Sequence, residues 1–536
     1  MWMGGAPVVA AMMIAAGPAM ADATAQETPA ADENLLTTYQ NPTDVRIADP
    51  FIYQEDGVYY MVGTTDNATG PGFDIYTSRD MTQWTRAGKC YTPTRESWGT
   101  QNFWAPEILK HDGKYYLHYT AFSRREDMRN ILVARADNPL GPYEDYAGPL
   151  FPGESVIDSH IYFDKESDEY YIYATPEKVT PSRIVGATIA PDFKALSSSA
   201  TLCLDAGYGW EDLWIEGPIV HRHKDVYYML YSGGAWWETE YSLGYATAPS
   251  PLGPWAKSST NPVLAPTGQM HGPGHNGLAW SPDGNELFVY YHVHAGYWTT
   301  RRVAAMDRIV FQPQVDGPDL LAIPGGPSHT PQPRPGGAPP ARRAVSDEFD
   351  GDALNADQWR VHANYPEMWT VRDGTLQVTP HPEDFWREKS DGQNVFLQNA
   401  PDGDFDIMTS VTMDARRAQE QAFITLWQDE DNYVMLGATM QEDLRFVVMR
   451  EIGAKNDGAV QANSLGWPVC LKMSKRGNEV TFFASRDGIV WEEVVRPRDI
   501  TGMTVRSVGL GAASPGSTRN LVAMFDWFRV ERVGVE

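Results

Sequence analysis

The sequence has few of the residues that support a covalent scaffold or bind polyanions. Its 536 residues include only three cysteines, Cys90, Cys203 and Cys470. Their wide spacing excludes a disulfide-rich scaffold, a CxxC redox motif and a thiolate zinc site. Basic residues are also scarce, because 43 Lys and Arg stand against 70 Asp and Glu, a formal net charge of −27. This balance argues against nucleic acid or an anionic membrane as the main partner.

Long apolar runs are absent from the rest of the chain after the N-terminal segment. No later run approaches the ~18 residues of a membrane helix. Residues 6–21 form an apolar run that ends in Ala19-Met-Ala21, although residues 1–5 carry no Lys or Arg. The run is typical of the apolar core and cleavage site of a secretory signal. We predict a signal peptide over 1–21, a polar leader over 22–38 and a secreted or periplasmic protein. A disordered N-terminus is the alternative.

Aromatic residues are abundant, with 18 Trp, 26 Tyr and 19 Phe, and the chain also has 47 Gly and 39 Pro. This combination is typical of many short strands joined by tight turns. Aromatic side chains also provide flat apolar faces that stack on sugar rings. Composition alone does not separate these two uses.

An internal repeat organises the first two-thirds of the chain. Five copies of one pattern, a strand, an acidic turn and a Tyr-rich second strand, begin at Ala48, Ala105, Ile157, Glu216 and Gly274. The Asp-Gly turns at Asp56, Asp112 and Asp283 give a spacing close to 57 residues, and two Pro-Leu-Gly-Pro segments (139–142 and 251–254) lie 112 apart, two repeats. Four short strands per repeat predict a five-bladed β-propeller over residues 39–322. A sandwich with coincidental hairpins is the alternative.

The remaining third divides into a linker and a second domain. Residues 323–343 contain seven Pro and four Gly in 21 residues, a composition that predicts a linker without packed elements, in part polyproline-like. Residues 344–536 show alternating runs such as Phe405–Met413 and Phe423–Trp427, separated by turn residues. They predict an antiparallel β-sandwich of jelly-roll type. The expected fold class is therefore all-β throughout.

The beginnings of the five first strands are expected to converge on one pocket, because the first strand of each propeller blade lines the central channel. These positions hold Asp49, the segment Trp104–Glu107, Asp158, Glu216 and His275. Cleavage of a glycosidic bond requires one protonated carboxyl group and one ionised carboxylate. A third carboxylate nearby raises the pKa of the proton donor by repulsion between like charges.

Five short motifs, in this order on a five-fold repeat, resemble glycoside hydrolase family 43. They are Ala48-Asp-Pro-Phe51, Trp104-Ala-Pro106, Ile157-Asp158, Glu216-Gly-Pro218 and Gly274-His-Asn276. The resemblance covers roughly residues 40–322. The second domain is similar to the concanavalin-like sandwich of many members, through Asp347-Glu-Phe-Asp350 and the hairpin Ser485–Trp491.

The resemblance implies an inverting mechanism with three acidic residues. Asp49 is then the general base, Glu216 the general acid, and Asp158 the modulator that orients the acid and raises its pKa. Inversion predicts a separation of about 6.5–9.5 Å between the Asp49 and Glu216 carboxyl groups, which leaves room for a water molecule.

Three further roles are implied by the same resemblance. Trp104 matches a tryptophan beside the sugar subsite, with packing between blades as the alternative. Arg301 matches an arginine that contacts sugar and carboxylates; strand alternation allows only one of Arg301 and Arg302 to face the pocket, and we choose Arg301. His275 matches a histidine associated with a channel Ca²⁺, and a structural histidine is the alternative.

Three more candidates come from the local sequence. Trp236 and Trp237 follow the fourth hairpin, where they form a stacking wall for sugar or pack between domains. The third motif reads Ile157-Asp-Ser-His160, where many relatives have Pro after the Asp, and alternation places His160 on the same side of the strand as Asp158. We therefore expect His160 in the pocket.

The expected function is an exo-acting glycosidase that releases arabinofuranose or xylose from plant polysaccharide or oligosaccharide. The alternatives are an endo-arabinanase, a galactose-releasing member of the family, and a carbohydrate-binding propeller without turnover. All three carboxylates are present, which disfavours the last of these. No nucleic-acid or membrane partner is expected.

Overall fold

The computed structural model describes residues 35–43, 45–65, 70–294, 301–380, 382, 394–453, 455–516 and 521–533. The predicted signal peptide (1–21) and most of the predicted leader (22–38) lie outside these residues. No helix in the described ranges combines the length and the apolar character that a membrane crossing would require.

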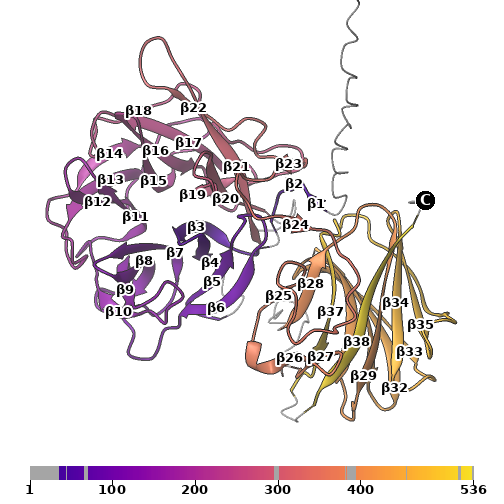
Figure 1. Ribbon diagram of the computed structural model, residues 1–536. Helices are drawn as coiled ribbons and strands as arrows, with labels where there is room; N and C mark the ends of the chain where they lie inside the picture. Colours follow the sequence, from indigo (N-terminus) through magenta and orange to yellow (C-terminus); the bar gives the residue numbers. More distant parts are fainter. Residues whose placement is uncertain are drawn as a thin grey trace, which may run out of the picture. The chain divides into compact units, whose positions relative to one another are not determined.

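The N-terminal part is a propeller of five four-stranded antiparallel sheets, each built from strands consecutive in sequence, as Figure 1 shows. Blades 1 and 2 comprise β3 (Ala48–Glu55), β4 (Val58–Thr64), β5 (Phe73–Ser78) and β6 (Thr85–Tyr91), then β7 (Trp104–His111), β8 (Lys114–Ser123), β9 (Met128–Ala136) and β10 (Glu144–Ala147). Blade 3 comprises β11 (Val156–Asp164), β12 (Glu169–Pro176), β13 (Arg183–Ile189) and β14 (Thr201–Asp205). Blades 4 and 5 comprise β15 (Ile215–His223), β16 (Val226–Gly233), β17 (Ser242–Ala248) and β18 (Ala256–Lys257), then β19 (Gly274–Trp280), β20 (Leu287–His294), β21 (Arg302–Gln312) and β22 (Leu320–Ala322). The predicted five-bladed propeller is confirmed.

The chain before β3 closes the propeller ring on the last blade. Thr43 donates its backbone N–H to the carbonyl of Ala304 in β21 over 2.7 Å, and Ala304 donates its own N–H to Val45 over 2.9 Å. The side chain of Asn41 exchanges two further hydrogen bonds with the backbone of Met306. The free edge of β21 is thereby paired, which protects it from intermolecular contact.

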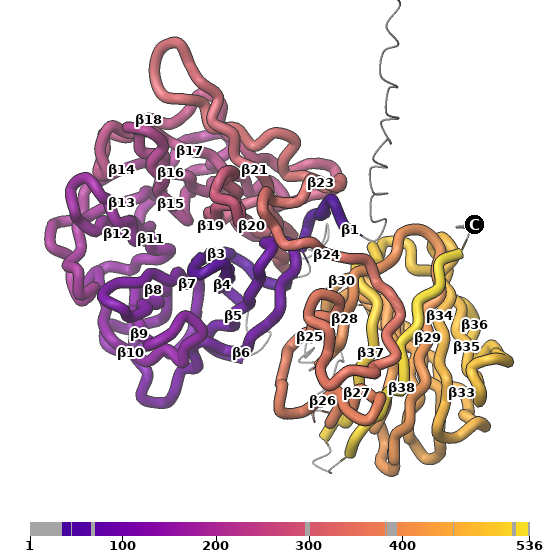
Figure 2. Tube along the Cα trace, viewed as in Figure 1, coloured from indigo at the N-terminus to yellow at the C-terminus, as the bar shows by residue number. Residues whose placement is uncertain are grey.

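The Pro/Gly-rich segment after blade 5 contains paired elements, contrary to the sequence prediction. Its strand β23 (Gln332–Pro333) pairs with β2 (Thr38–Tyr39), and its strand β24 (Ala341–Arg342) pairs with β1 (Leu35–Leu36), so both ends of the propeller chain run together (Figure 2). Each strand is only two residues long and lies at an edge. Pro333 is tolerated there because an edge position does not require its missing N–H.

Aromatic side chains fill the space between blades. At the junction of blades 1 and 2, Phe73 packs edge-on against Tyr119 with ring centroids 5.2 Å apart, and Tyr91 and Phe103 complete the cluster. Edge-to-face pairs of this kind add to the apolar area that they bury. Most of the aromatic surplus of the sequence is used in such cores rather than at the surface.

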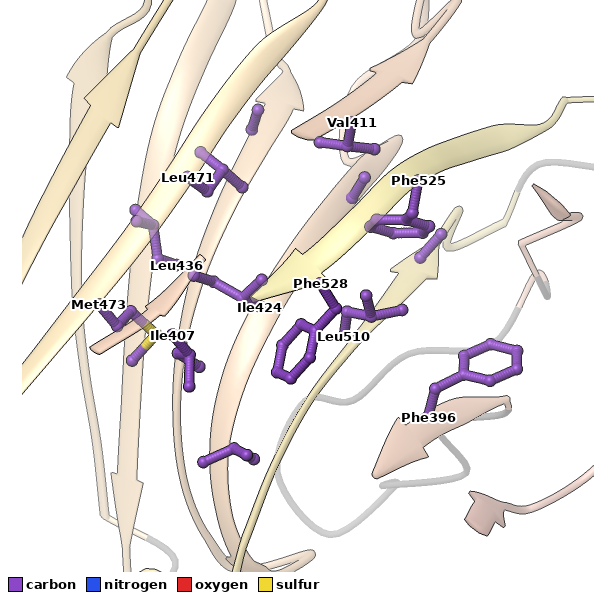
Figure 3. Close-up of a cluster of buried hydrophobic side chains, with 14 of the residues drawn as sticks. Phe396, Ile407, Val411, Ile424, Leu436, Leu471, Met473, Leu510, Phe525 and Phe528 are labelled. Atoms are coloured by element: carbon purple, nitrogen blue, oxygen red, sulfur yellow. The ribbon is translucent and has the colours of Figure 1, made fainter. Parts of the chain in front are cut away.

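The C-terminal part is a sandwich of two seven-stranded antiparallel sheets. In spatial order the first contains β25 (Arg360–His362), β28 (Val395–Asn399), β37 (Ser507–Ala513), β30 (Gln421–Asp429), β31 (Asn432–Met440), β32 (Leu444–Ile452) and β33 (Lys455–Ala462). The second contains β26 (Trp369–Arg372), which follows the 3₁₀-helix η1 (Pro366–Met368), then β27 (Thr375–Val378), β38 (Ala523–Arg532), β29 (Phe405–Met413), β34 (Val469–Arg476), β35 (Glu479–Ser485) and β36 (Glu492–Asp499). Inward-facing residues of both sheets, such as Ile424 and Phe525, form its core (Figure 3). The predicted sandwich is confirmed.

Gly277 in β19 marks a close approach of blade 5 to blade 1. A Cβ atom at this position would lie 2.3 Å from the carbonyl oxygen of Pro50, a backbone atom in β3 that has little freedom to move. We expect Gly277→Ala to lower the free energy of unfolding by about 1–3 kcal/mol, because overpacking displaces neighbouring backbone. Urea unfolding followed by tryptophan fluorescence measures the difference.

Gly268→Ala is the matched control for this substitution. Gly268 has no atom within 4 Å of the position of its added Cβ, and its backbone does not adopt a left-handed φ. Its unfolding midpoint should stay at or slightly above that of the unmodified protein. Equal midpoints for the two variants would contradict the close blade contact.

Candidate active site

Each first strand of the propeller begins with an irregular backbone that points side chains toward the channel. The pairing of the first strand with the second shifts register at this place in all five blades. The residue at the shift has a positive φ in every blade: Asp49 (51°), Ala105 (40°), Asp158 (54°), Gly217 (60°) and His275 (46°). Positive φ is uncommon for residues other than glycine and costs conformational energy. Its recurrence at five equivalent positions makes it a property of the repeat.

One pocket of about 420 Å³ lies over these strand beginnings. It is lined by Asp49, Trp104, Ile157, Asp158, Glu177, Asp212, Trp214, Glu216, Ala235, Trp236, Trp237, His275 and Arg302. The volume is within the ~300–1,000 Å³ typical of small-molecule sites. The structure therefore brings together the three carboxylates, the histidine and the three tryptophans that the sequence singled out.

Asp49 is buried and surrounded by polar partners. Its Oδ2 accepts a hydrogen bond from the Thr64 hydroxyl over 2.5 Å, and its Oδ1 lies 3.2 Å from Arg302 Nη1 and 3.3 Å from His275 Nδ1. Burial by itself raises the pKa of this carboxyl, but His275 and the permanent charge of Arg302 outweigh burial and hold the pKa below its ordinary value. Asp49 is therefore ionised at neutral pH.

His292 contacts Asp49 through the backbone of that residue. Its Nδ1 accepts the backbone N–H of Asp49 over 3.2 Å, and burial lowers the pKa of His292 to about 3. The ring is neutral at working pH and acts as a hydrogen-bond acceptor. It stacks on Tyr241 with centroids 5.6 Å apart, and Tyr241 in turn contacts Glu216.

Glu216 is buried, and each of its carboxyl oxygens accepts a hydrogen bond. Tyr241 donates its hydroxyl to Oε1 over 2.8 Å, and the indole N–H of Trp214 donates to Oε2 over 2.7 Å. Burial raises the pKa of Glu216 to about 6; the two hydrogen bonds act in the opposite direction, and the charge of Asp49 adds to the rise. Glu216 can thus hold a proton at mildly acidic pH and release it.

Asp158 carries the third carboxyl group of the pocket. Its backbone N–H donates to the Thr120 hydroxyl over 3.0 Å, and its Oδ2 lies 3.8 Å from His275 Nδ1. Burial raises the pKa of Asp158 well above its ordinary value, and the charges of Glu216 and Asp49 raise it further. Asp158 and Glu216 interact closely, so they titrate as a pair.

The arginine in the pocket is Arg302, and the choice of Arg301 was wrong. Arg302 is the first residue of β21 and packs its guanidinium 4.4 Å from the ring centroid of Trp236. Arg301 precedes the strand, and its Nη1 donates to Asp431 of the C-terminal domain over 2.7 Å. Alternation correctly limits the pocket to one of the two residues, but the register of β21 decides which.

His160 does not line the pocket either. Its Nδ1 lies 2.9 Å from Oε2 of Glu107, and its ring stacks on Tyr173. The register of β11 against β12 shifts between Ile157 and His160, so residues two apart no longer share one side of the strand. That shift invalidates the alternation on which the expectation for His160 depended.

The tryptophans form the walls of the pocket. Trp104 lies under the guanidinium of Arg129, 5.0 Å from its ring centroid, and Arg129 binds both oxygens of Glu177. Trp236 and Trp237 meet edge-to-face with ring centroids 5.7 Å apart, and Trp237 is 58% exposed. Exposure at the mouth of the pocket leaves an aromatic face free for a ligand.

His275 lies in the pocket with its Nδ1 facing the Asp49 carboxylate. The described residues contain no group of three or more His, Cys, Asp or Glu side chains that could hold a metal ion. Calcium prefers six to eight oxygen ligands. The side chains around His275 do not by themselves supply such a set, and the Ca²⁺ ion stays a prediction.

Sequence reasoning missed Trp214, Glu177 and Asp212, and it named Arg302 only as the alternative to Arg301. Trp214 lies two residues before Glu216, the spacing at which strand residues share a side, and this signal was available. Glu177 and Asp212 lie on connections, where no repeat marks them. In chemical terms the pocket combines an ionised carboxylate with a carboxyl group that holds a proton at mildly acidic pH, the requirement for acid–base hydrolysis.

Comparison with known families covers both domains. The family model described as "Glycosyl hydrolases family 43" matches residues 39–315, more than half of the chain. A second model, DUF1349, described as a protein family of unknown function, matches residues 362–533, and its members are concanavalin-like β-sandwiches.

Individual relatives match either about half of this chain or nearly all of it. A β-D-galactofuranosidase of Aspergillus niger is 26% identical over 52% of this chain and 86% of its own length. A non-reducing-end α-L-arabinofuranosidase of Bacteroides ovatus is 23% identical over 92% of this chain and 94% of its own length. The crystal structure of a family 43 protein of Bacillus licheniformis aligns with a TM-score of 0.61 at 22% identity, over 92% of this chain and 99% of that one. The last match supports the two-domain fold alone.

Proposed function

Because this chain belongs to glycoside hydrolase family 43, we propose that it is an exo-acting, inverting glycosidase. It releases arabinofuranose or xylose from the non-reducing end of a plant polysaccharide or oligosaccharide. The observation that carries the proposal is the pairing of two carboxyl groups with opposite pKa shifts in one tryptophan-walled pocket. Asp49 is ionised and Glu216 holds a proton at mildly acidic pH.

The proposed reaction is a single displacement. Glu216 donates its proton to the glycosidic oxygen while the bond from that oxygen to the anomeric carbon breaks. A water molecule attacks the anomeric carbon from the opposite face, and Asp49 accepts the proton that this water loses. The sugar is released with inverted configuration, and exchange with solvent returns Asp49 and Glu216 to their starting protonation states.

The neighbouring groups have supporting roles in this proposal. Arg302 keeps Asp49 ionised, and Trp214 and Tyr241 fix the orientation of Glu216. Asp158 acts as the modulator, because ionisation of either member of the Asp158–Glu216 pair raises the pKa of the other. Trp104, Trp236 and Trp237 offer faces on which the sugar rings stack.

Among the candidate sugars, a furanose is the preferred one. The Bacteroides ovatus relative, which aligns over nearly its whole length, is named for releasing α-L-arabinofuranose, and the Aspergillus niger relative is named for β-D-galactofuranose. Galactofuranose is therefore a further candidate beside arabinofuranose and xylose. The excess of acidic side chains in the pocket disfavours substrates that carry their own carboxylate.

A substrate screen tests the proposal. We expect hydrolysis of 4-nitrophenyl α-L-arabinofuranoside, with slower or no hydrolysis of the β-D-xyloside and the β-D-galactofuranoside. Proton NMR during the first turnovers should show the product in the configuration opposite to that of the substrate. A product of retained configuration would overturn the inverting mechanism. Binding of arabino-oligosaccharides without cleavage of any glycoside would favour a binding propeller.

Export to the periplasm or the medium is proposed on the sequence of residues 6–21 alone. Neither nucleic acid nor a membrane surface is proposed as a partner, because the chain carries a net charge of −27.

A further inference from the structure

A repeated hydrogen bond joins one blade to the next at four of the five junctions around the pocket. A threonine, serine or histidine near the end of the second strand in one blade accepts the N–H of the positive-φ residue in the following blade. The four pairs are Thr64 with Ala105 (2.8 Å), Thr120 with Asp158 (3.0 Å), Ser232 with His275 (2.7 Å) and His292 with Asp49 (3.2 Å). These contacts hold the strained backbone of the pocket residues in place.

The junction between blades 3 and 4 lacks this bond. Thr175 occupies the equivalent place in β12, paired with Ile157 as Thr64 is paired with Ala48. It is fully buried, yet its hydroxyl has no hydrogen-bond partner among the described residues. Thr64 and Thr175 are thus the same residue type in the same position of two blades, one bonded and one not.

Thr64 makes a second bond that ties the pocket together. Its hydroxyl proton is donated to Oδ2 of Asp49 over 2.5 Å, and its oxygen accepts the backbone N–H of Ala105 over 2.8 Å. Ala105 directly follows Trp104, a wall of the pocket. A single hydroxyl therefore connects the carboxylate of blade 1 to the aromatic wall of blade 2.

The second bond restricts the rotation of the Asp49 carboxylate. Arg302 and His275 both face Oδ1, so Thr64 is the partner that fixes Oδ2. Without the hydroxyl, the carboxylate is free to turn about its terminal torsion, which is intrinsically soft. The N–H of Ala105 also loses its acceptor inside the protein, which is costly for a buried donor.

We propose that Thr64 is a positioning residue that sets the orientation of Asp49 relative to Trp104 and hence to the attacking water. This inference rests on the proposed role of Asp49 as the general base. It predicts that loss of the hydroxyl lowers the rate of the chemical step more than the binding of substrate.

Three variants in the full-length protein test this role. Thr64→Val removes the hydroxyl and keeps the branched shape, Thr64→Ser keeps the hydroxyl, and Thr175→Val removes the unbonded hydroxyl of blade 3. On the best aryl glycoside we expect kcat of Thr64→Val to fall about 10²-fold with little change in KM, because small misplacements of a catalytic group have effects of this size. Thr64→Ser should recover most of the rate, and Thr175→Val should stay near the unmodified value.

A crystal structure of each variant gives a readout that does not depend on turnover. We expect the Asp49 carboxylate to rotate or shift in Thr64→Val and to keep its place in Thr64→Ser and Thr175→Val. An unmoved carboxylate in Thr64→Val, or equal losses of kcat in Thr64→Val and Thr175→Val, would overturn the positioning role. A rotated carboxylate in a protein that cleaves no glycoside would support the positioning role and reject the proposed function.

Discussion

Replacing Asp49 by Asn is expected to lower kcat/KM on the order of 10³-fold, within the range attributed to general acid–base catalysis. Asparagine has nearly the shape of aspartate, and its amide still offers an oxygen to Arg302 and a nitrogen to the Thr64 hydroxyl. It cannot accept a proton from water. Initial rates with a 4-nitrophenyl glycoside measure the loss, and thermal unfolding confirms that the fold is retained.

A small external nucleophile separates loss of the base from general damage to the site. Azide needs no deprotonation, so adding azide to Asp49→Asn should restore turnover and give a glycosyl azide of inverted configuration. The same addition should not restore Glu216→Gln with a poor leaving group. Unchanged activity of Asp49→Asn, or a glycosyl azide of retained configuration, would contradict the assignment of Asp49 as the base.

The second large effect is expected for Glu216→Gln, and it should depend on the leaving group. With an oligosaccharide or alkyl glycoside, whose leaving oxygen needs a proton, we expect kcat/KM to fall roughly 10²–10⁴-fold. With a 2,4-dinitrophenyl glycoside the leaving group departs as an anion, so the loss should be small. An equal loss on both substrates would exclude Glu216 as the proton donor.

The pH dependence follows from the same two groups. Glu216 must be protonated to act, and burial raises its pKa to about 6, so activity should fall as the pH rises through about 6. Asp49 must be ionised, and its lowered pKa keeps it ionised at mildly acidic pH, so its protonation should cause no loss of activity on the acid side. Glu216→Gln should remove the descending limb, as measured with the dinitrophenyl substrate. A descending limb that persists in the variant would assign it to another group.

The repeat made most of the propeller predictable. Alternating strands, Asp-Gly turns and a spacing near 57 residues give the number of blades, and the start of each first strand gives the positions of Asp49, Asp158 and Glu216. In the structure, the turn residues Asp56 and Gly57 both have positive φ, at 49° and 72°, as a tight hairpin turn requires.

Two site residues were misplaced because alternation alone does not determine register. The shift in β11 between Ile157 and His160 adds a residue that no sequence pattern marks. For Arg301 and Arg302, the register is set by the pairing of Arg302 with His294, a long-range contact rather than a local preference. The Pro/Gly-rich segment was misjudged for a similar reason, since its strands depend on partners about 300 residues away in the sequence.

The threonines that join the blades were within reach of the sequence. Thr64, Thr120 and Thr175 lie at or near the end of the second strand in three successive repeats, at separations of 56 and 55 residues, and Ser232 follows at 57. Their position was visible in the repeat, but their partners were not. Which of these residues donates a hydrogen bond to a carboxylate depends on side-chain geometry, and this geometry cannot be predicted from a single sequence.

The closure of the ring by the chain before β3 has a consequence for how the protein folds. Thr43 and Ala304 are separated by 261 residues, so the first segment of the propeller to be synthesised finds its partner almost last. Contacts of such long range are reached slowly, because the intervening loop must be ordered first. The first blade therefore lacks its final support until the fifth has formed. The ring of blades therefore stays open until the last blade has been synthesised.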